Sequence, residues 1–277
     1  MLKEQTFNTG VTAINYAEGP PSGSPLVLLH GGGDRWQSFL PILPALAMRW
    51  HVFALDLRGH GKSGRVPHQY RPEDYARDVT AFLEQQLNEP PALFGHSLGG
   101  WVALLTAARL GGRVRALILG DPPLNVEHFV ASESTESQIS QWRAMRELVG
   151  SGLSVAGLAS ELADLYGADA AQFRGWAKTL SQVDPDAMQY HAEGRIQEYV
   201  ENVDIDAALG QVSCPVLLLQ ADPSQGGMVS DGDVEHVLSL LADGLHVKLE
   251  GADHNLGLST WEVTPLLRAV AGFLESL

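Results

Sequence analysis

Six short apolar runs, each about the length of a strand, constrain this chain more than any other feature of its sequence. Continuous runs of this kind are typical of strands that are covered on both faces, as in a parallel sheet. Helix-like stretches lie between them, from Pro72 onward and over residues 98–110 and 261–274. The alternation predicts a doubly wound α/β sheet with right-handed crossovers. The runs are residues 26–29, 52–55, 92–94, 116–119, 216–219 and 246–249.

Two regions depart from this alternation. Residues 6–14 have the pattern of a hairpin with its turn near residues 8–10, which predicts an antiparallel edge on an otherwise parallel sheet. Between the strands that end near residue 121 and begin near residue 216, the pattern is helical. An insertion that long in a compact fold usually forms a lid or a binding element. We therefore predict a core of residues 1–121 and 212–277 and a helical cap of residues 122–211.

Composition and charge exclude several classes of protein. Hydrophobic residues make up 45% and charged residues 18% of the chain, unlike a disordered or fibrous sequence. The formal net charge is −15, from 18 basic and 33 acidic residues, so a polyanion would be repelled. We expect no nucleic-acid partner and no adhesion to an anionic membrane. There is no apolar run of membrane-spanning length, no recognisable signal peptide, and a single cysteine, Cys214. These features favour a cytoplasmic protein and leave its oligomeric state open.

The strongest local motif is G-H-S-L-G at residues 95–99, which follows a predicted strand and precedes a predicted helix. A G-x-S-x-G nucleophile elbow requires this context. The turn is so tight that side chains two positions before and after the serine would clash, which explains Gly95 and Gly99. Ser97 is then held above the sheet, where the first amides of the helix point, and is the predicted nucleophile. We expect the neighbouring His96 to point elsewhere.

A serine needs a base to activate it, and the base needs an acid to orient it. For this elbow the chain order is serine, acid, histidine. Among the ten histidines, His254 is well placed, because it follows the last predicted strand at the edge where such folds bind ligands. Other histidines, including His60 and His191, have no catalytic context. We expect them at the surface or in packing positions.

A glycine-rich loop, H-G-G-G at residues 30–33, follows the first long parallel strand. The backbone amide of Gly32, together with that of Leu98, would form an oxyanion hole. A second glycine-rich segment, residues 59–64, imitates a dinucleotide fingerprint, but Pro67 follows where a helix should open. No metal-binding spacing occurs. The sequence therefore predicts neither a metal nor a cofactor.

These residues resemble the α/β-hydrolase superfamily over nearly the whole chain. The resemblance rests on the elbow, on residues 30–32 and 56–64, and on the segment G-A-D-H at residues 251–254. It implies an eight-stranded sheet with a helical cap after the sixth strand, a Ser–acid–His triad, and hydrolysis without a cofactor. Dehalogenases and epoxide hydrolases of this superfamily carry a nucleophilic aspartate. Serine at position 97 instead implies acyl transfer through an acyl-enzyme.

The resemblance leaves the acid of the triad open between Asp121 and Asp222. The family usually takes it from the loop after the seventh strand, where Asp222 is displaced by two positions from the usual place. Some capped relatives, such as haloalkane dehalogenases, take it from the end of the sixth strand, which matches Asp121. We favour Asp121 slightly and keep Asp222.

The resulting hypothesis is a serine hydrolase that cleaves small-molecule carboxylic esters with small to medium acyl groups. The same triad serves C–C bond hydrolases, lactonases and perhydrolases, and some relatives are small-molecule receptors with little turnover, so these alternatives stay open. Large side chains of the predicted cap would line an apolar pocket or form the core of the cap. They are Trp142, Met145, Phe173 and Trp176.

Overall fold

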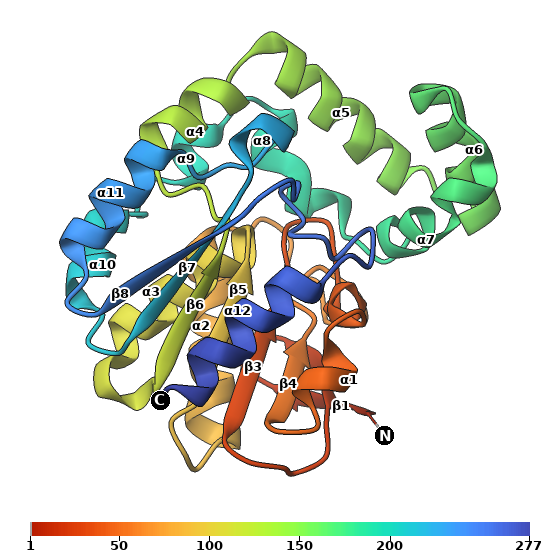
Figure 1. Cartoon of the computed structure of the whole chain (residues 1–277). Helices are drawn as coiled ribbons and strands as arrows, with labels where there is room; N and C mark the ends of the chain where they lie inside the picture. The colour runs from red at the N-terminus through yellow and green to blue at the C-terminus, as the bar shows by residue number, and fades with distance from the viewer. Residues whose placement is uncertain (1) are drawn as a thin grey trace.

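The computed structural model describes residues 2–277 and contains an eight-stranded sheet flanked by helices (Figure 1). The strand order is β1-β2-β4-β3-β5-β6-β7-β8. The pairs β1–β2 and β2–β4 are antiparallel, and the other neighbours are parallel. This confirms the predicted eight-stranded, mostly parallel α/β sheet and its antiparallel edge. The strands are β1 (Lys3–Asn8), β2 (Ala13–Glu18), β3 (Pro25–Leu29), β4 (His51–Leu55), β5 (Ala92–His96), β6 (Ala116–Gly120), β7 (Val216–Ala221) and β8 (Gly244–Leu249).

Burial explains why the central strands are continuous apolar runs. Every residue of β3, β5, β6 and β7 is buried, so both faces of each strand must be apolar. The edge strands differ. In β1 the polar sequence K-E-Q-T-F-N buries only Phe7, and in β8 only Leu249 is fully buried.

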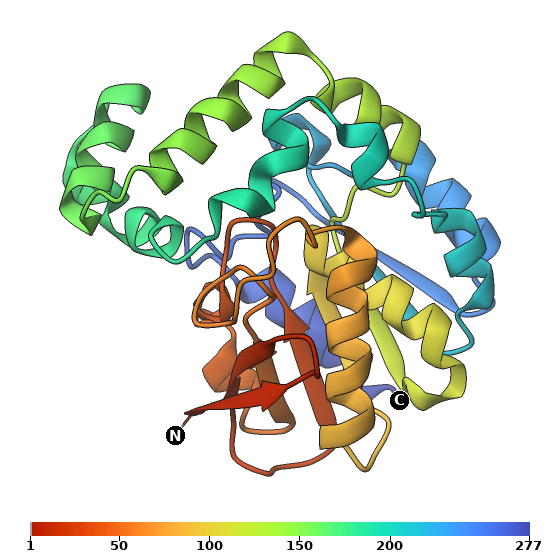
Figure 2. The same ribbon diagram turned by 180° about the vertical axis from the view of Figure 1, so that it is seen from behind.

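Helices cover both faces of the sheet, and the two views in Figures 1 and 2 show these layers. Each layer has its own apolar cluster against the strands. One layer comprises η1 (Trp36–Phe39), α1 (Leu43–Leu46) and α12 (Thr264–Glu275). The other comprises α2 (Pro72–Gln86), α3 (Leu98–Leu110), α10 (Ile205–Gln211) and α11 (Asp231–Leu240). Short 3₁₀ turns occur at η2 (Gly111–Arg113) and η4 (Pro223–Gln225).

The last helix begins three residues later than predicted. Trp261 is 66% exposed and has a positive φ of 65°, which lies outside the right-handed helical region. Pro265 occupies the first turn of α12, where its missing N–H costs no helical hydrogen bond. The predicted start at residue 261 is therefore wrong, and the helix begins at Thr264.

Between β6 and β7 the described residues form helices and turns but no strand. Part of this segment arches over the ends of the strands and extends beyond the sheet (Figures 1 and 2). Its middle part has an apolar cluster of its own, centred on Leu158, Leu162 and Leu180. Helix α10, at its end, belongs to the layer on the sheet instead. Besides α10 the elements are α4 (Val126–Glu133), α5 (Glu136–Gly150), α6 (Val155–Tyr166), α7 (Ala170–Leu180), η3 (Pro185–Met188), α8 (Gln189–Ala192) and α9 (Ile196–Tyr199).

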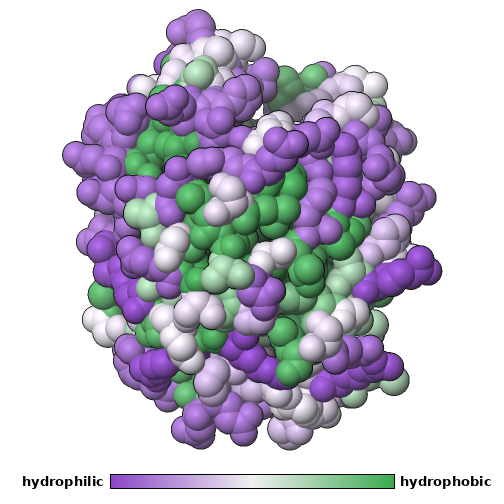
Figure 3. Space-filling view, turned by 60° about the vertical axis from the view of Figure 1, so that its left-hand side comes forward, coloured by the Kyte–Doolittle hydropathy of each residue, from purple (hydrophilic) through white to green (hydrophobic). Residues whose placement is uncertain are grey.

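The surface is mixed in character. Figure 3 shows one side of the molecule, on which hydrophobic residues gather in a central patch bordered by hydrophilic ones. Over residues 2–277, no helix combines the length and the apolar character needed to cross a membrane.

Candidate active site

Ser97 lies in the sharp turn between β5 and α3, with φ 53° and ψ −121°. Such a backbone conformation costs a non-glycine residue about 1–3 kcal/mol. The Ser97 N–H donates a hydrogen bond of 2.9 Å to the Gly120 carbonyl, which ties the turn to β6. A Cβ on Gly95 would collide with the Gly99 carbonyl oxygen, and one on Gly99 with the Leu29 carbonyl oxygen. The two glycines of the motif are thus required by the tight turn.

A chain of hydrogen bonds connects three side chains from the ends of three strands. Ser97 Oγ lies 2.9 Å from His254 Nε2, and His254 Nδ1 lies 2.7 Å from Asp121 Oδ2. Asp121 directly follows β6 and His254 follows β8. A neutral His254 that donates its Nδ1–H to Asp121 presents Nε2 as the acceptor for the Ser97 hydroxyl. This is the geometry that a serine nucleophile, a base and an orienting acid require.

Asp121 is completely buried and is held by backbone N–H groups. Its carboxylate accepts hydrogen bonds from the amides of Ala221 at 3.1 Å, Met228 at 2.8 Å and Val229 at 3.2 Å. A buried carboxylate needs such partners to offset its lost hydration. The end of β7 and the loop after it therefore fix the carboxylate that is hydrogen-bonded to His254.

The structure places Asp222 elsewhere. Its carboxylate accepts hydrogen bonds from the backbone amides of Ser224 at 2.9 Å and Gly251 at 3.1 Å. Hydrogen bonds from the side chain and the backbone of Ser224 lower the pKa of Asp222 below its ordinary value. Asp222 thus joins the loop after β7 to the loop that carries His254. Of the two candidate acids, Asp121 is the one that contacts His254.

His96 contributes more than the sequence indicated. Its Nε2–H donates to the His254 carbonyl oxygen at 2.7 Å, and the two ring centroids are 4.9 Å apart. Burial lowers the pKa of His96 to about 4, so the ring is neutral at pH 7. The prediction that this side chain points elsewhere missed the contact, because the two histidines lie 158 positions apart in the chain.

The glycine-rich loop after β3 is held by His60. The Gly33 N–H donates to His60 Nε2 at 3.1 Å, and His60 Nδ1–H donates to the Arg58 carbonyl at 2.9 Å. Burial lowers the pKa of His60 to about 4, which keeps Nε2 available as an acceptor. The sequence predicts His60 at the surface or in a packing position, and the structure buries it beside the site. His60 holds the loop that carries Gly32, a residue that lines the same cavity as Leu98.

Ser97 and His254 open into a cavity of about 300 Å³ between the carboxyl ends of the strands and the helices that follow β6. Gly32 and Leu98 line it as well. Most of its wall is apolar, which suits a small organic substrate. The further lining residues are Gly33, His60, Tyr75, Trp101, Pro123, Phe129, Glu133, Trp142, Val183, Ala187, Met188, His191, Tyr199 and Met228.

A neighbouring cavity of about 670 Å³ shares Gly32, Gly33, Trp142 and Met188 with the first. Of the predicted pocket side chains, Trp142 lines both cavities, and Met145 and Trp176 line the second. Phe173 lines neither. Its ring stacks on Tyr166 with a centroid distance of 5.7 Å. We call the two spaces the inner and the outer cavity.

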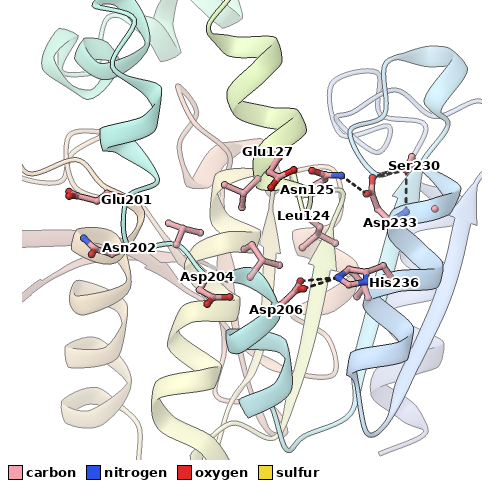
Figure 4. A pocket seen from close by; sticks show the side chains of 15 residues that line it. Leu124, Asn125, Glu127, Glu201, Asn202, Asp204, Asp206, Ser230, Asp233 and His236 are labelled. Atoms are coloured by element: carbon pink, nitrogen blue, oxygen red, sulfur yellow. Dashed lines mark hydrogen bonds and ion pairs between the residues drawn. The ribbon is translucent and has the colours of Figure 1, made fainter.

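A third cavity, of about 1060 Å³, lies between α4, α10 and α11 (Figure 4). Acidic side chains such as Glu127, Asp204 and Asp233 line it, and Asp206 is paired with His236 at 3.0 Å. Ser97 and His254 are not among its lining residues. Nowhere in residues 2–277 do three or more His, Cys, Asp or Glu side chains form a group that could hold a metal ion.

Comparisons with known proteins agree on the fold and differ on the reaction. A family model described as "alpha/beta hydrolase fold" matches residues 24–259. The 2-(acetamidomethylene)succinate hydrolase of Mesorhizobium japonicum is 25% identical, over 92% of this chain and 89% of that protein. A non-heme haloperoxidase of Rhodococcus erythropolis is 28% identical, over 92% of this chain and 93% of that protein. The structure of a thermophilic esterase from Thermogutta terrifontis superposes with a TM-score of 0.74 at 20% identity, covering 99% of this chain and 98% of that one.

Proposed function

Because the chain belongs to the alpha/beta hydrolase fold family, we propose that it is a serine hydrolase that cleaves carboxylic esters of small to medium acyl substrates. The observation that carries this proposal is the hydrogen-bonded chain from Ser97 through His254 to Asp121, with Ser97 on its strained turn. The apolar inner cavity of about 300 Å³ beside Ser97 favours a small or medium acyl group.

In the proposed mechanism, Ser97 Oγ attacks the ester carbonyl carbon while His254 Nε2 takes its proton. Collapse of the tetrahedral intermediate expels the alcohol, which receives that proton from His254. Water then attacks the acyl-enzyme with His254 again as the base, which releases the acid and restores Ser97. Asp121 holds the imidazole in the required tautomer, and the amides of Gly32 and Leu98 stabilise the oxyanion. The helices between β6 and β7 act as a cap that shields the cavity from water.

A second candidate is perhydrolysis, which the 28% identity to a protein named a haloperoxidase favours. In this reaction hydrogen peroxide replaces water in the second step, so that the acyl-enzyme yields a peracid instead of a carboxylic acid. No redox cofactor takes part. Peracid formation from an acetate ester and hydrogen peroxide, measured against hydrolysis of the same ester, distinguishes the two reactions.

The proposal is tested by labelling with a fluorophosphonate and locating the adduct by peptide mass spectrometry. We expect a single adduct on Ser97. The variant Ser97→Ala should take up no label and lose about 10⁴- to 10⁶-fold in kcat, with an unchanged circular dichroism spectrum. Ester hydrolysis that survives in the folded variant would rule out Ser97 as the nucleophile.

A further inference from the structure

Glu133, the last residue of α4, is a buried carboxylate in the inner cavity and is 7% exposed. The Trp142 Nε1–H donates to Glu133 Oε2 at 2.6 Å, and the Gln138 Nε2–H donates to Oε1 at 3.3 Å. A carboxylate has about four acceptor positions. Two neutral donors therefore leave Glu133 able to accept a further hydrogen bond from a ligand in the cavity.

His191, on α8, lines the same cavity and is 9% exposed. Its Nδ1 is buried and has no hydrogen-bond partner within residues 2–277, and its Nε2 lies 4.0 Å from Glu133 Oε2, beyond hydrogen-bonding distance. Burial lowers the pKa of His191 to about 4, so the ring is neutral at pH 7. A buried polar atom without a partner is costly and points to a missing one, such as a polar ligand group.

No cation balances Glu133 in this cavity. Neither lysine nor arginine occurs among the described residues that line it. Of its three histidines, burial keeps His60 and His191 neutral, and His254 is paired with Asp121 rather than with Glu133. A substrate carboxylate would meet an uncompensated negative charge here. A hydroxyl or an ammonium group would find a free acceptor at Glu133 and a polar neighbour in His191.

We infer that Glu133, Trp142 and His191 form a specificity site that selects substrates with a hydrogen-bond donor beyond the ester group, a hydroxyl or an ammonium, and rejects carboxylates. This inference rests on the proposed ester hydrolysis at Ser97. Glu133 accepts the donor, Trp142 holds Glu133 in place through its indole N–H, and the ring of His191 supplies a second polar contact.

Four methyl esters with the same chain length and different ends test this specificity: heptanoate, 6-hydroxyhexanoate, 6-aminohexanoate and the half ester of adipic acid. Proton release gives kcat/KM for each. A hydrogen bond to a charged group contributes about 1.5–3 kcal/mol, so the hydroxyl and ammonium esters should exceed heptanoate about 10- to 100-fold. The adipate half ester should be the poorest. Equal rates for all four, or a preference for adipate, would overturn the inference.

The variant Glu133→Gln separates charge from hydrogen bonding. It keeps an acceptor oxygen for Trp142 and removes the charge, so the preference for the ammonium ester should vanish and the adipate half ester should gain. Glu127→Gln, an exposed change on the same helix, is the matched control and should leave the ranking unchanged. An unaltered ranking in Glu133→Gln, with a thermal unfolding curve like that of the unmodified protein, would contradict the inference.

Two further measurements separate this inference from the proposed function. Methyl acetate has no group beyond the ester, so its hydrolysis reports on Ser97 alone. Calorimetric binding of the four esters to Ser97→Ala reports on the specificity site without turnover. If the unmodified protein hydrolyses nothing but Ser97→Ala binds the hydroxyl and ammonium esters best, the proposed function fails and the specificity site stands. If the unmodified protein hydrolyses methyl acetate but does not discriminate among the four esters, the specificity site fails and the proposed function stands.

Discussion

The sheet and the helical segment between β6 and β7 contribute to the same cavity in different ways. The sheet supplies Ser97, Asp121 and His254 from strand ends, and backbone amides hold the Asp121 carboxylate at three points. The helical segment supplies Glu133, which accepts hydrogen bonds from other side chains, and His191, whose Nδ1 has no hydrogen-bond partner among residues 2–277. Under the proposed function, the sheet would fix the chemistry of the site, whereas the helices would determine which substrate fits.

The largest effect on kcat is expected from replacing the aspartate that contacts His254. Asp121→Asn should lower kcat about 10⁴-fold, by analogy with other triads, because an amide that donates to His254 Nδ1 favours the wrong tautomer. Asp222→Asn changes a residue that caps a loop and should cost far less. Steady-state kinetics of both variants on one ester make the measurement.

The two aspartates are matched, since both follow neighbouring strands and both bind backbone amides. If both variants lost only a little of their kcat, and by similar amounts, neither aspartate would orient His254. A large loss of kcat in Asp222→Asn alone would show that the loop between β7 and β8 matters more than the carboxylate of Asp121, which follows β6.

The same comparison explains how much the sequence revealed. The elbow was predictable because a local pattern encodes it: a buried strand, glycines two positions on either side of Ser97, and then a helix. His254 followed from chain order and from its place after a strand. The acid stayed open between two residues, since only the three-dimensional positions of β7 and β8 distinguish Asp121 from Asp222.

The polar residues around the cavity were not predictable in this way. The sequence predicts His60 and His191 at the surface or in packing positions, and both are buried, but no pattern indicates that they line the cavity. Nor does any pattern single out Glu133. Each depends on contacts between distant parts of the chain, such as that of His60 with Gly33 across 27 positions. A helix pattern shows which residues are apolar, but it does not show which polar residue faces a cavity. The glycines that flank His60 at positions 59 and 61 were the available signal for that residue.

A smaller effect is expected in how the free energy of unfolding depends on pH. Burial lowers the pKa of His60, His96 and His191 to about 4, whereas a histidine in an unfolded chain titrates near 6.5. Between these values the unfolded chain binds more protons, so the free energy of unfolding should fall as the pH is lowered from about 6.5 to about 4. Each histidine contributes up to about 1.4 kcal/mol per pH unit in this window. Urea unfolding at pH 7 and pH 5 measures the change.

His191 belongs to the helical segment, whereas His60 and His96 belong to the sheet region. If the two regions unfold as one unit, His191→Gln should reduce the pH dependence of the single transition by about one proton. His128→Gln, at an exposed site on α4, is the control. Two separate urea transitions, with only one of them sensitive to His191→Gln, would instead show that the helical segment unfolds on its own.

The smallest effect is expected in the outer cavity, where the helices alone form most of the wall. Trp176 lines this cavity and is 39% exposed, whereas Phe173, on the same helix, lines neither cavity. Trp176→Ala should raise KM for long-chain esters about fourfold for each methylene that loses contact, and it should leave acetate esters unaffected. Phe173→Ala should lower the thermal stability of the helical segment without this dependence on chain length, because its ring packs on Tyr166. A chain-length series of esters distinguishes the two variants. If Trp176→Ala also lowered kcat for acetate esters, the helices would take part in the chemistry. The sheet would then not be the sole source of catalysis, and the contrast between the two regions would not hold.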